Sequence, residues 1–257
     1  MYQAIVRFHY RDFEQDPVQL INQIVEQWRY NGQIIGREVG ITYHQGVEDV
    51  EFQLRVAVPE QESLELKWQN ERVAQAIAYA REQGIVWQSV EIIGRDYNAE
   101  QTSPPSRPAF QLLYTTHLDS CSPVYNGEDF CPQPLYRLGI SAELSEAIIK
   151  WQEDWQACDQ LQMNGSVLET AALAEISDHS SHLSRQGQRL CRQLEQQTGI
   201  PTYYYLYRLG KNSELEHSRR CPSCQRDWRL SEPLHQIFHF KCDHCRLISN
   251  LSWEVQG

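Results

Sequence analysis

Two Cys-x-x-Cys pairs near the C-terminal end constrain the fold more than any other feature of the sequence. Cys221 and Cys224 form the first pair, Cys242 and Cys245 form the second, and 17 residues separate them. This spacing is typical of a zinc site in which each pair forms a knuckle, a tight turn that presents two thiolates to one metal ion. Four thiolates complete a closed tetrahedral site without an open position. The sequence therefore predicts one structural Zn²⁺.

The residues around the two pairs fit a small zinc ribbon over 208–257. The segment between the pairs must run out and return as a hairpin so that the second pair faces the first. Ribbons often have glycine directly after the second cysteine of a knuckle, and this chain has Gln225 and Arg246 there. Three short strands are expected. Trp228 and Leu230 fall in the first, Ile237 to Phe240 form the second, and Leu247, Leu251 and Trp253 lie on one face of the third.

The competing interpretation of the cysteine pairs is two redox-active motifs. Motifs of the thioredoxin type lie at the start of a helix, and neither pair here precedes a helical pattern. The chain has eight cysteines in all. It begins without a basic stretch followed by a long apolar run, and no window approaches the ~20 apolar residues that cross a bilayer. We therefore expect a cytoplasmic protein without a membrane partner, in which paired cysteines bind metal instead of forming disulfides.

The first 97 residues predict a ferredoxin-like domain with the element order βαββαβ. Asp16 followed by Pro17 predicts a helix start, and Gly32 predicts its end. A second helix is expected over 70–83. The four strands are expected at Ala4 to Phe8, Val39 to His44, Val50 to Val58 and Ile85 to Ile93.

A linker and a second domain follow. Residues 98–108 contain three prolines, which is typical of a linker. Residues 109–207 predict a mainly helical middle domain, which opens and closes with short strands at Phe110 to Thr115 and Tyr203 to Tyr207. Three helices are expected between these strands, with caps at Ser141 and Ser166 and a stop at Gly199. The fold class is therefore α+β.

The loop after the first strand of this middle domain is a candidate for a second metal site. His117, Cys121 and Cys131, together with Asp119 and Asp129, carry metal-binding side chains, but their spacing is irregular. The alternative is a loop with two ordinary thiols. The sequence has no glycine-rich phosphate loop, nucleophile elbow or His-Glu-x-x-His motif. We therefore expect a protein that is not an enzyme.

The charge distribution separates the ribbon from the rest of the chain. Net charge is −11 overall, but the segment from Pro201 onward has eight Lys or Arg and six Asp or Glu. Cations for phosphates and aromatic rings for base stacking are the ingredients of nucleic-acid binding. The rings near these cations are Tyr203 to Tyr205, Trp228, Phe238 and Trp253. The alternative is that the aromatic residues are core and the cations are solvated. The candidate contacts to DNA or RNA are Arg208, Arg219, Arg220, Arg226, Arg229, Lys241 and Arg246.

The chain resembles a bacterial family of zinc-ribbon-containing proteins whose label infers nucleic-acid binding from the ribbon. The resembling residues are Thr198–Pro201 with Tyr203–Leu206, Arg220–Pro222 with Cys224 and Trp228, Phe240–Cys242, Cys245–Leu247, Ser249–Asn250 and Pro134–Leu138. The resemblance implies a bacterial source and the four-cysteine zinc site. It also implies a more cysteine-rich loop near Cys121 and Cys131, so this chain would have lost ligands there.

Two functions remain open at this point. The leading prediction is a zinc-binding, non-enzymatic protein that binds nucleic acid through the ribbon. The rival is a protein–protein adaptor in which the ribbon is a structural or docking module.

Overall fold

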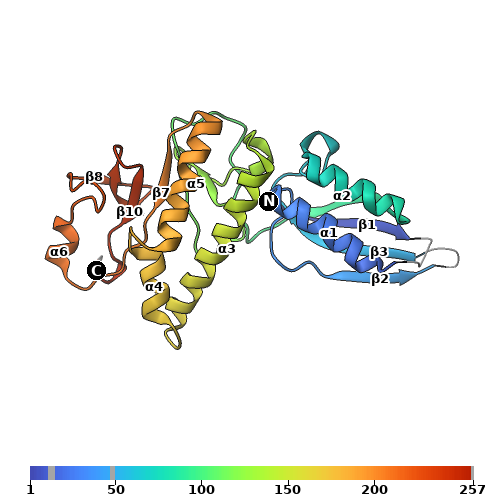
Figure 1. Cartoon of the computed structure of the whole chain (residues 1–257), viewed down its shortest axis with the longest axis horizontal. Coiled ribbons are helices and arrows are strands. Elements are labelled where there is room, and N and C mark those ends of the chain that lie inside the picture. The colour runs from blue at the N-terminus through green and yellow to red at the C-terminus, as the bar shows by residue number, and fades with distance from the viewer. Residues whose placement is uncertain (11–14, 47–49, 256–257) are drawn as a thin grey trace. The chain divides into compact units, whose positions relative to one another are not determined.

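The computed structural model describes residues 1–10, 15–46 and 50–255, and these form two compact units. Unit 1 consists of Met1–Pro104, Ser120–Ser122 and Cys131–Glu146. Unit 2 consists of Pro105–Asp119, Pro123–Phe130 and Ala147–Gly257, of which the last two residues lie outside the described part. Each unit contains one sheet with helices packed on it (Figure 1). The chain is therefore a mixed α and β protein.

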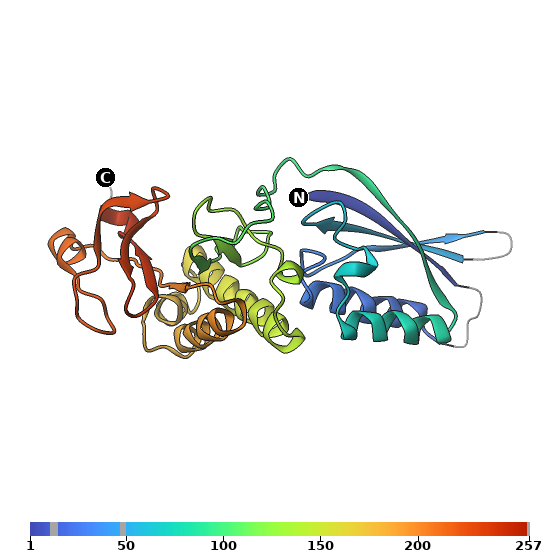
Figure 2. The ribbon, with the colours of Figure 1, turned by 90° about the horizontal axis from the view of Figure 1, so that it is seen from above.

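Unit 1 has a four-stranded sheet in the order β2-β3-β1-β4, and all neighbouring strands are antiparallel. Helices α1 and α2 lie side by side on one face of it (Figure 2). The elements of unit 1 are β1 (Tyr2–Tyr10), α1 (Pro17–Tyr30), β2 (Ile41–Gln45), β3 (Val50–Val58), the 3-10 helix η1 (Leu66–Trp68), α2 (Glu71–Glu82), β4 (Ile85–Arg95) and the 3-10 helix η2 (Leu135–Arg137).

Local sequence explains these elements well. The Asp16 side chain accepts a hydrogen bond from the backbone N–H of Val18, and Pro17 occupies the first helical position, so the predicted start of α1 is confirmed. Alternate residues of β1 are buried because one face of the strand contacts the helices. The core of unit 1 is formed by these residues of β1 and by apolar residues of β3, α1 and α2, among them Val6, Phe8, Ile24, Trp28, Phe52, Leu54 and Val73.

The segment Pro134–Leu138 also belongs to unit 1, although it follows the predicted linker. The Leu135 side chain packs against Gly32, where an added Cβ would lie 2.9 Å from the Leu135 Cβ. The Tyr136 hydroxyl donates a hydrogen bond to Glu60, and the Arg137 guanidinium forms a 2.7 Å ion pair with the same carboxylate. These contacts explain why apolar, aromatic and basic residues follow one another in this segment.

Unit 2 has a six-stranded sheet in the order β6-β5-β7-β10-β9-β8. Strand β7 runs parallel to both of its neighbours, and the other pairs are antiparallel. The elements are β5 (Gln111–Leu113), β6 (Val124–Asn126), α3 (Ala142–Asn164), which begins in unit 1, α4 (Glu169–Ser177), α5 (His182–Thr198), β7 (Thr202–Tyr205), α6 (Ser213–Ser218), β8 (Arg229–Leu234), β9 (Phe238–Cys242), β10 (Leu247–Asn250) and the 3-10 helix η3 (Trp253–Val255).

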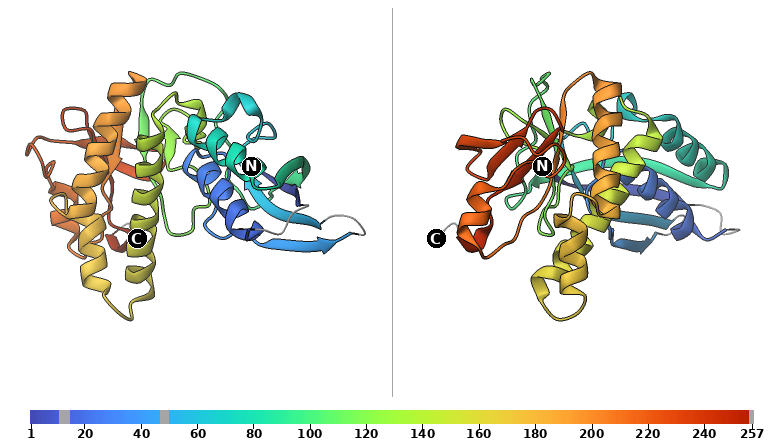
Figure 3. Two further views of the ribbon diagram at one scale, coloured as in Figure 1. Left: turned by 45° about the vertical axis from the view of Figure 1, so that its right-hand side comes forward. Right: turned by 60° about the vertical axis from the view of Figure 1, so that its left-hand side comes forward.

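The central strand β7 connects the helices of unit 2 to the ribbon strands. Helices α3 and α5 run side by side (Figures 1 and 3) and pack on this strand. Gly187 of α5 permits the close approach, because a Cβ there would lie 2.2 Å from the Tyr204 ring and 2.8 Å from the Trp151 indole nitrogen. On its other edge β7 pairs with β10, so the helical region and the ribbon share one sheet.

Two sequence predictions in unit 2 were wrong. Helix α4 begins at Glu169 and not at a Ser166 cap, because Leu168 precedes it in the left-handed conformation, with φ 57°, and makes no side-chain capping bond. Trp253 does not extend the last ribbon strand. Strand β10 ends at Asn250, and Trp253 lies in η3 with half of its surface exposed. Within residues 1–10, 15–46 and 50–255, no helix combines the length and apolarity that a membrane span requires.

Candidate metal centre

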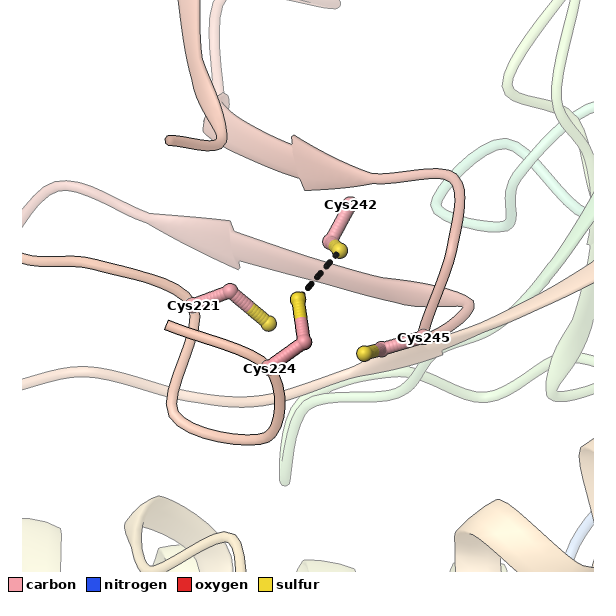
Figure 4. A group of neighbouring side chains, drawn as sticks. All are labelled: Cys221, Cys224, Cys242 and Cys245. Atoms are coloured by element: carbon pink, nitrogen blue, oxygen red, sulfur yellow. Dashed lines mark hydrogen bonds between the residues drawn. The ribbon is translucent and has the colours of Figure 1, made fainter. Parts of the chain in front are cut away.

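The four ribbon cysteines meet at one point of unit 2. Cys221 and Cys224 flank a turn before β8, Cys242 ends β9, and Cys245 precedes β10. Their Sγ atoms all lie within 4.8 Å of one another, and those of Cys224 and Cys242 are 3.7 Å apart (Figure 4). A disulfide has an S–S distance of about 2.0 Å, so these thiols are free. The four side chains could hold one metal ion.

The backbone of each knuckle turns through a left-handed residue. Gln225 has φ 60° and Arg246 has φ 55°, and each directly follows the second cysteine of its pair. In the first knuckle the Gln225 N–H donates to the Cys221 carbonyl at 2.9 Å, and the Cys221 N–H donates to the Arg226 carbonyl at 3.0 Å. These bonds bring the two cysteines of the pair onto the same side of the turn.

The four cysteines differ in exposure. Cys221 and Cys242 are buried, whereas Cys224 and Cys245 are half-buried. Burial raises the pKa of the Cys221 thiol to about 12. A hydrogen bond from the backbone N–H of Arg226 is the main cause that lowers the pKa of Cys224 to about 7. One thiol of the group is therefore readily deprotonated near neutral pH, and a metal ion would have to displace protons from the others.

The second knuckle is tied directly to the helical part of unit 2. The backbone N–H of Tyr204 in β7 donates to the Arg246 carbonyl at 2.9 Å. The Arg246 guanidinium forms a two-pronged ion pair with Glu195 of α5 at 3.1 Å, and this contact lowers the pKa of the Glu195 carboxyl. The position of the Cys245 thiol is thus fixed by contacts to both β7 and α5.

A cavity of about 350 Å³ lies beside Cys245. Helix α5 contributes Cys191, Arg192 and Glu195 to its wall, and another part of the wall comes from both knuckles. Ser223 and His244 belong to the knuckle part of the wall. One metal-ligand candidate therefore borders a space large enough for a small molecule.

The structure does not bring the other candidate metal ligands into a comparable group. His117 is paired with Asp159, whose Oδ2 lies 2.8 Å from the His117 backbone nitrogen and 3.0 Å from its Nδ1. Cys121 is buried and Cys131 is half-buried, and both are assigned to unit 1. Across the described residues, the ribbon cysteines are the group that brings three or more metal-binding side chains together.

Four of the seven candidate nucleic-acid contacts are engaged inside the protein. Arg208 and Arg219 both pair with Glu216, a carboxylate that is almost completely buried. Arg219 also stacks on Phe240, with the guanidinium carbon 4.1 Å from the ring centroid, and burial lowers its pKa to about 10. The two remaining pairs are Lys241 with Asp243 and Arg246 with Glu195.

The other three candidates are exposed and surround the first knuckle. We call Arg220, Arg226 and Arg229 the knuckle arginines. Arg220 lies 3.5 Å from Asp227, with both side chains well exposed, and Arg229 donates to the His217 carbonyl. Most of the aromatic residues predicted to stack on bases differ from these arginines in exposure. Tyr203, Tyr204, Tyr205, Trp228 and Phe238 are buried, whereas Trp253 is half exposed.

Sequence reasoning did not find Glu195 and Glu216 as partners of the ribbon arginines. Each lies on a helix, and Glu195 is 51 residues from Arg246, so no local spacing connects the two. Glu216 lies on α6, which periodicity did not reveal because it has only six residues.

Three family models match successive parts of the chain, and each is described as a domain of unknown function. They are DUF8589 over residues 1–94, DUF2310 over residues 105–207 and DUF8594 over residues 210–255. The first model ends within β4, one residue before the end of this strand, and the third covers the four cysteines.

Relatives from Haemophilus influenzae match most of the chain. One, named "Uncharacterized protein", is 52% identical over 236 residues, which cover 91% of this chain and 90% of the relative. A second with the same name is 57% identical over 172 residues, covering 66% of this chain and 85% of the relative. Among solved structures, the designed protein Foldit4 covers 37% of this chain and 97% of its own at 16% identity, but its TM-score of 0.24 is too low to inform the fold.

Proposed function

Since the chain belongs to the same bacterial family as these Haemophilus influenzae proteins, we propose that it is a zinc-binding, non-enzymatic protein that contacts nucleic acid through its ribbon. The observation that carries the zinc site is the convergence of four thiols from two knuckles. A tetrahedron of sulfur ligands about 2.3 Å from zinc has edges of about 3.8 Å. The 3.7 Å between the Cys224 and Cys242 sulfurs is in keeping with that geometry.

The role proposed for zinc is to hold the ribbon together. Four thiolates leave no coordination position for water or substrate, so the ion supplies structure and not catalysis. The first knuckle precedes β8 and the second starts at the end of β9, so both lie at the open end of the β8–β9 hairpin. Strand β10 continues from the second knuckle into the six-stranded sheet. We therefore expect the ion to fix strands β8 and β9 against β10.

The nucleic-acid contact is assigned to the knuckle arginines. These three side chains are exposed around the first knuckle, where Arg220 forms a surface pair with the exposed Asp227. Each of the other four candidate cations is less exposed and pairs with a carboxylate of the protein. Five of the six rings predicted to stack on bases are buried, and Trp253 alone of the six is half exposed. Most contacts are therefore expected to go to phosphates and few to base faces. We therefore expect sequence-independent binding that weakens steeply with salt.

A titration of fluorescence anisotropy tests this assignment with labelled single-stranded and duplex DNA and RNA at low and physiological salt. The variant Arg226→Ala/Arg229→Ala should weaken binding about tenfold or more. It should also reduce the slope of log affinity against log salt by about 1.8 for a duplex.

The matched control is Arg185→Ala/Arg189→Ala, which removes two exposed arginines from α5. Its affinity should stay close to that of the unchanged protein. Equal losses in both variants, or no binding even at low salt, would reject the nucleic-acid function.

An adaptor role is the second candidate, and a groove in unit 1 favours it. The groove has a volume of about 700 Å³ between β4 and the segment before α2. Leu66 on its rim is 75% exposed, and Leu64, Val90 and Ile92 contribute to its lining. The variant Leu66→Asp should then lose a partner that co-purifies with the unchanged protein, while its nucleic-acid affinity stays the same.

Three further assignments belong to this proposal. For unit 1 we propose the ferredoxin-like arrangement, which is supported by the strand order β2-β3-β1-β4 and by two helices on one face. The division into parts at 1–97, 98–108, 109–207 and 208–257 stays a prediction. A cytoplasmic location is proposed because zinc-binding thiolates persist in a reducing compartment.

A further inference from the structure

We propose that Cys245 is a modification site, the ligand thiolate at which peroxides attack the metal centre. This inference rests on the proposed zinc site. It assigns a chemical role to the cavity beside the second knuckle. It also predicts that oxidants release the metal ion and so destabilise the ribbon.

Access distinguishes Cys245 from its buried neighbours. Cys221 and Cys242 are shielded from solvent, so a molecule in solution cannot reach their sulfur atoms without a structural change. Cys245 is half-buried and borders the cavity of about 350 Å³. Hydrogen peroxide is far smaller than this space. The remaining half-buried ligand, Cys224, lies on the other knuckle and is the natural competitor in any test.

The cavity also holds groups that would assist the reaction. A thiolate attacks one peroxide oxygen, the O–O bond breaks, and hydroxide leaves and takes up a proton. Arg192 is an exposed guanidinium in the α5 part of the wall, and the Ser223 hydroxyl lies in the knuckle part. Both are donors that stabilise a departing hydroxide. The product on Cys245 is a sulfenic acid.

A second thiolate then completes the oxidation. The other three ligand sulfurs lie within 4.8 Å of the Cys245 sulfur, so one of them can attack the sulfenic sulfur. A disulfide bond forms, the S–O bond breaks, and hydroxide leaves and takes up a proton. In total, two thiolates, one hydrogen peroxide and two protons give one disulfide and two waters. The two sulfur atoms are oxidised and the two peroxide oxygens are reduced. Two of four metal ligands are thereby lost, so the ion is released.

Ligand exchange identifies the attacked sulfur. Histidine can replace one cysteine of a structural zinc site, so Cys245→His and its matched control Cys224→His should each bind one zinc ion. After hydrogen peroxide is added, zinc release measured with a colorimetric chelator should be about tenfold slower for Cys245→His than for the unchanged protein. The control should release zinc at a rate within about threefold of the unchanged protein. The opposite order would overturn the proposal.

A second pair of variants tests the cavity without changing a ligand. Arg192→Trp places an indole in the cavity, and Arg189→Trp makes the same change on an exposed position of α5 outside its lining. Arg192→Trp alone should slow peroxide-driven release, with no change in zinc content. Equal rates for both variants would contradict attack through this cavity.

Zinc content before oxidation separates the proposed zinc-binding function from the proposed role of Cys245. A protein purified without zinc would reject the proposed function itself. A protein with one zinc ion, in which peptide mapping finds the first oxidised sulfur at Cys224, would reject only the role of Cys245.

Discussion

The backbone of the candidate metal centre is strained at two left-handed residues, one in each knuckle. Gln225 and Arg246 have φ values of 60° and 55°, and this conformation costs about 1–2 kcal/mol for a residue with a Cβ. The sequence marked both positions as places where ribbons have glycine, and the structure explains why glycine would fit there. Arg246 has a compensating contact, because its side chain pairs with Glu195.

Replacing Gln225 by glycine should therefore stabilise the metal-loaded ribbon. We expect Gln225→Gly to raise the free energy of unfolding by about 0.5–1 kcal/mol, since relief of strain exceeds the added entropy of the unfolded chain. Urea unfolding of the zinc-loaded protein measures this quantity. Gln225→Ala is the control and should bring no gain, so equal stability of the two variants would refute the strain.

Arg219 shows that a cation near the ribbon can have a purely internal role. Its guanidinium stacks on Phe240, pairs with the buried Glu216 and donates to the Asn250 carbonyl at 2.6 Å. Arg219→Ala should destabilise unit 2 by about 3–5 kcal/mol, because the buried Glu216 carboxylate loses one of its two arginine partners and the stacking on Phe240 is lost as well.

The exposed neighbour Arg220 is the control for this prediction. Arg220→Ala should change the free energy of unfolding by less than about 1 kcal/mol. Urea unfolding followed by tryptophan fluorescence reports on both, since Trp228 contacts the Arg219 side chain. A loss for Arg219→Ala as small as that for Arg220→Ala would contradict the buried pair.

At the scale of elements, helix α5 depends on one small residue. Gly187 faces the rings of Tyr204 and Trp151, and both are fully buried. Gly187→Ala should destabilise unit 2 by about 1–3 kcal/mol, because an added methyl group overlaps these rings. Gln193→Ala, on the exposed side of the same helix, should stay within about 0.5 kcal/mol. Equal thermal unfolding temperatures for the two variants would disprove the close packing at Gly187.

Elements with strong local signals were predictable from the sequence. The Asp16–Pro17 cap predicted the start of α1, and the Gly199 stop predicted the end of α5. The expected strand Ala4 to Phe8 lies within β1, and the expected strand Val50 to Val58 matches β3. Pairing between distant strands was not predictable. Strand β7 joins β5 and β10 in parallel, and parallel pairing leaves no turn in the sequence that links the partners. The three-residue strand β6 is too short for a periodic pattern.

The candidate site was predictable only in part for the same reason. The spacing of the two cysteine pairs is visible in the sequence itself, and the structure brings all four thiols together. The use of an arginine depends instead on which carboxylate the fold brings near. Arg246 meets Glu195, and Arg208 meets the buried Glu216 of the short helix α6, so both arginines already have a carboxylate partner within the protein. Composition alone could not separate them from the exposed knuckle arginines.

At the scale of the whole molecule, the two units should respond differently to metal removal. Unit 1 has its own apolar core and contains none of the ribbon cysteines. Chelation with EDTA should therefore remove amide-exchange protection from β8, β9 and β10, while β1, β3 and β4 stay protected. Readdition of zinc should restore the ribbon. Uniform loss of amide-exchange protection over both units, or no loss of protection in the ribbon, would show that the metal does not have the proposed structural role.

The metal content of the protein tests the central claim most directly. Native mass spectrometry of the chain purified without chelator should find one zinc ion per molecule. Cys242→Ser should bind none, while Cys158→Ser, which changes a thiol of α3 outside the group, should keep the full amount. A full zinc content in Cys242→Ser, or an unchanged protein without zinc whose ribbon cysteines are joined as disulfides, would contradict the account.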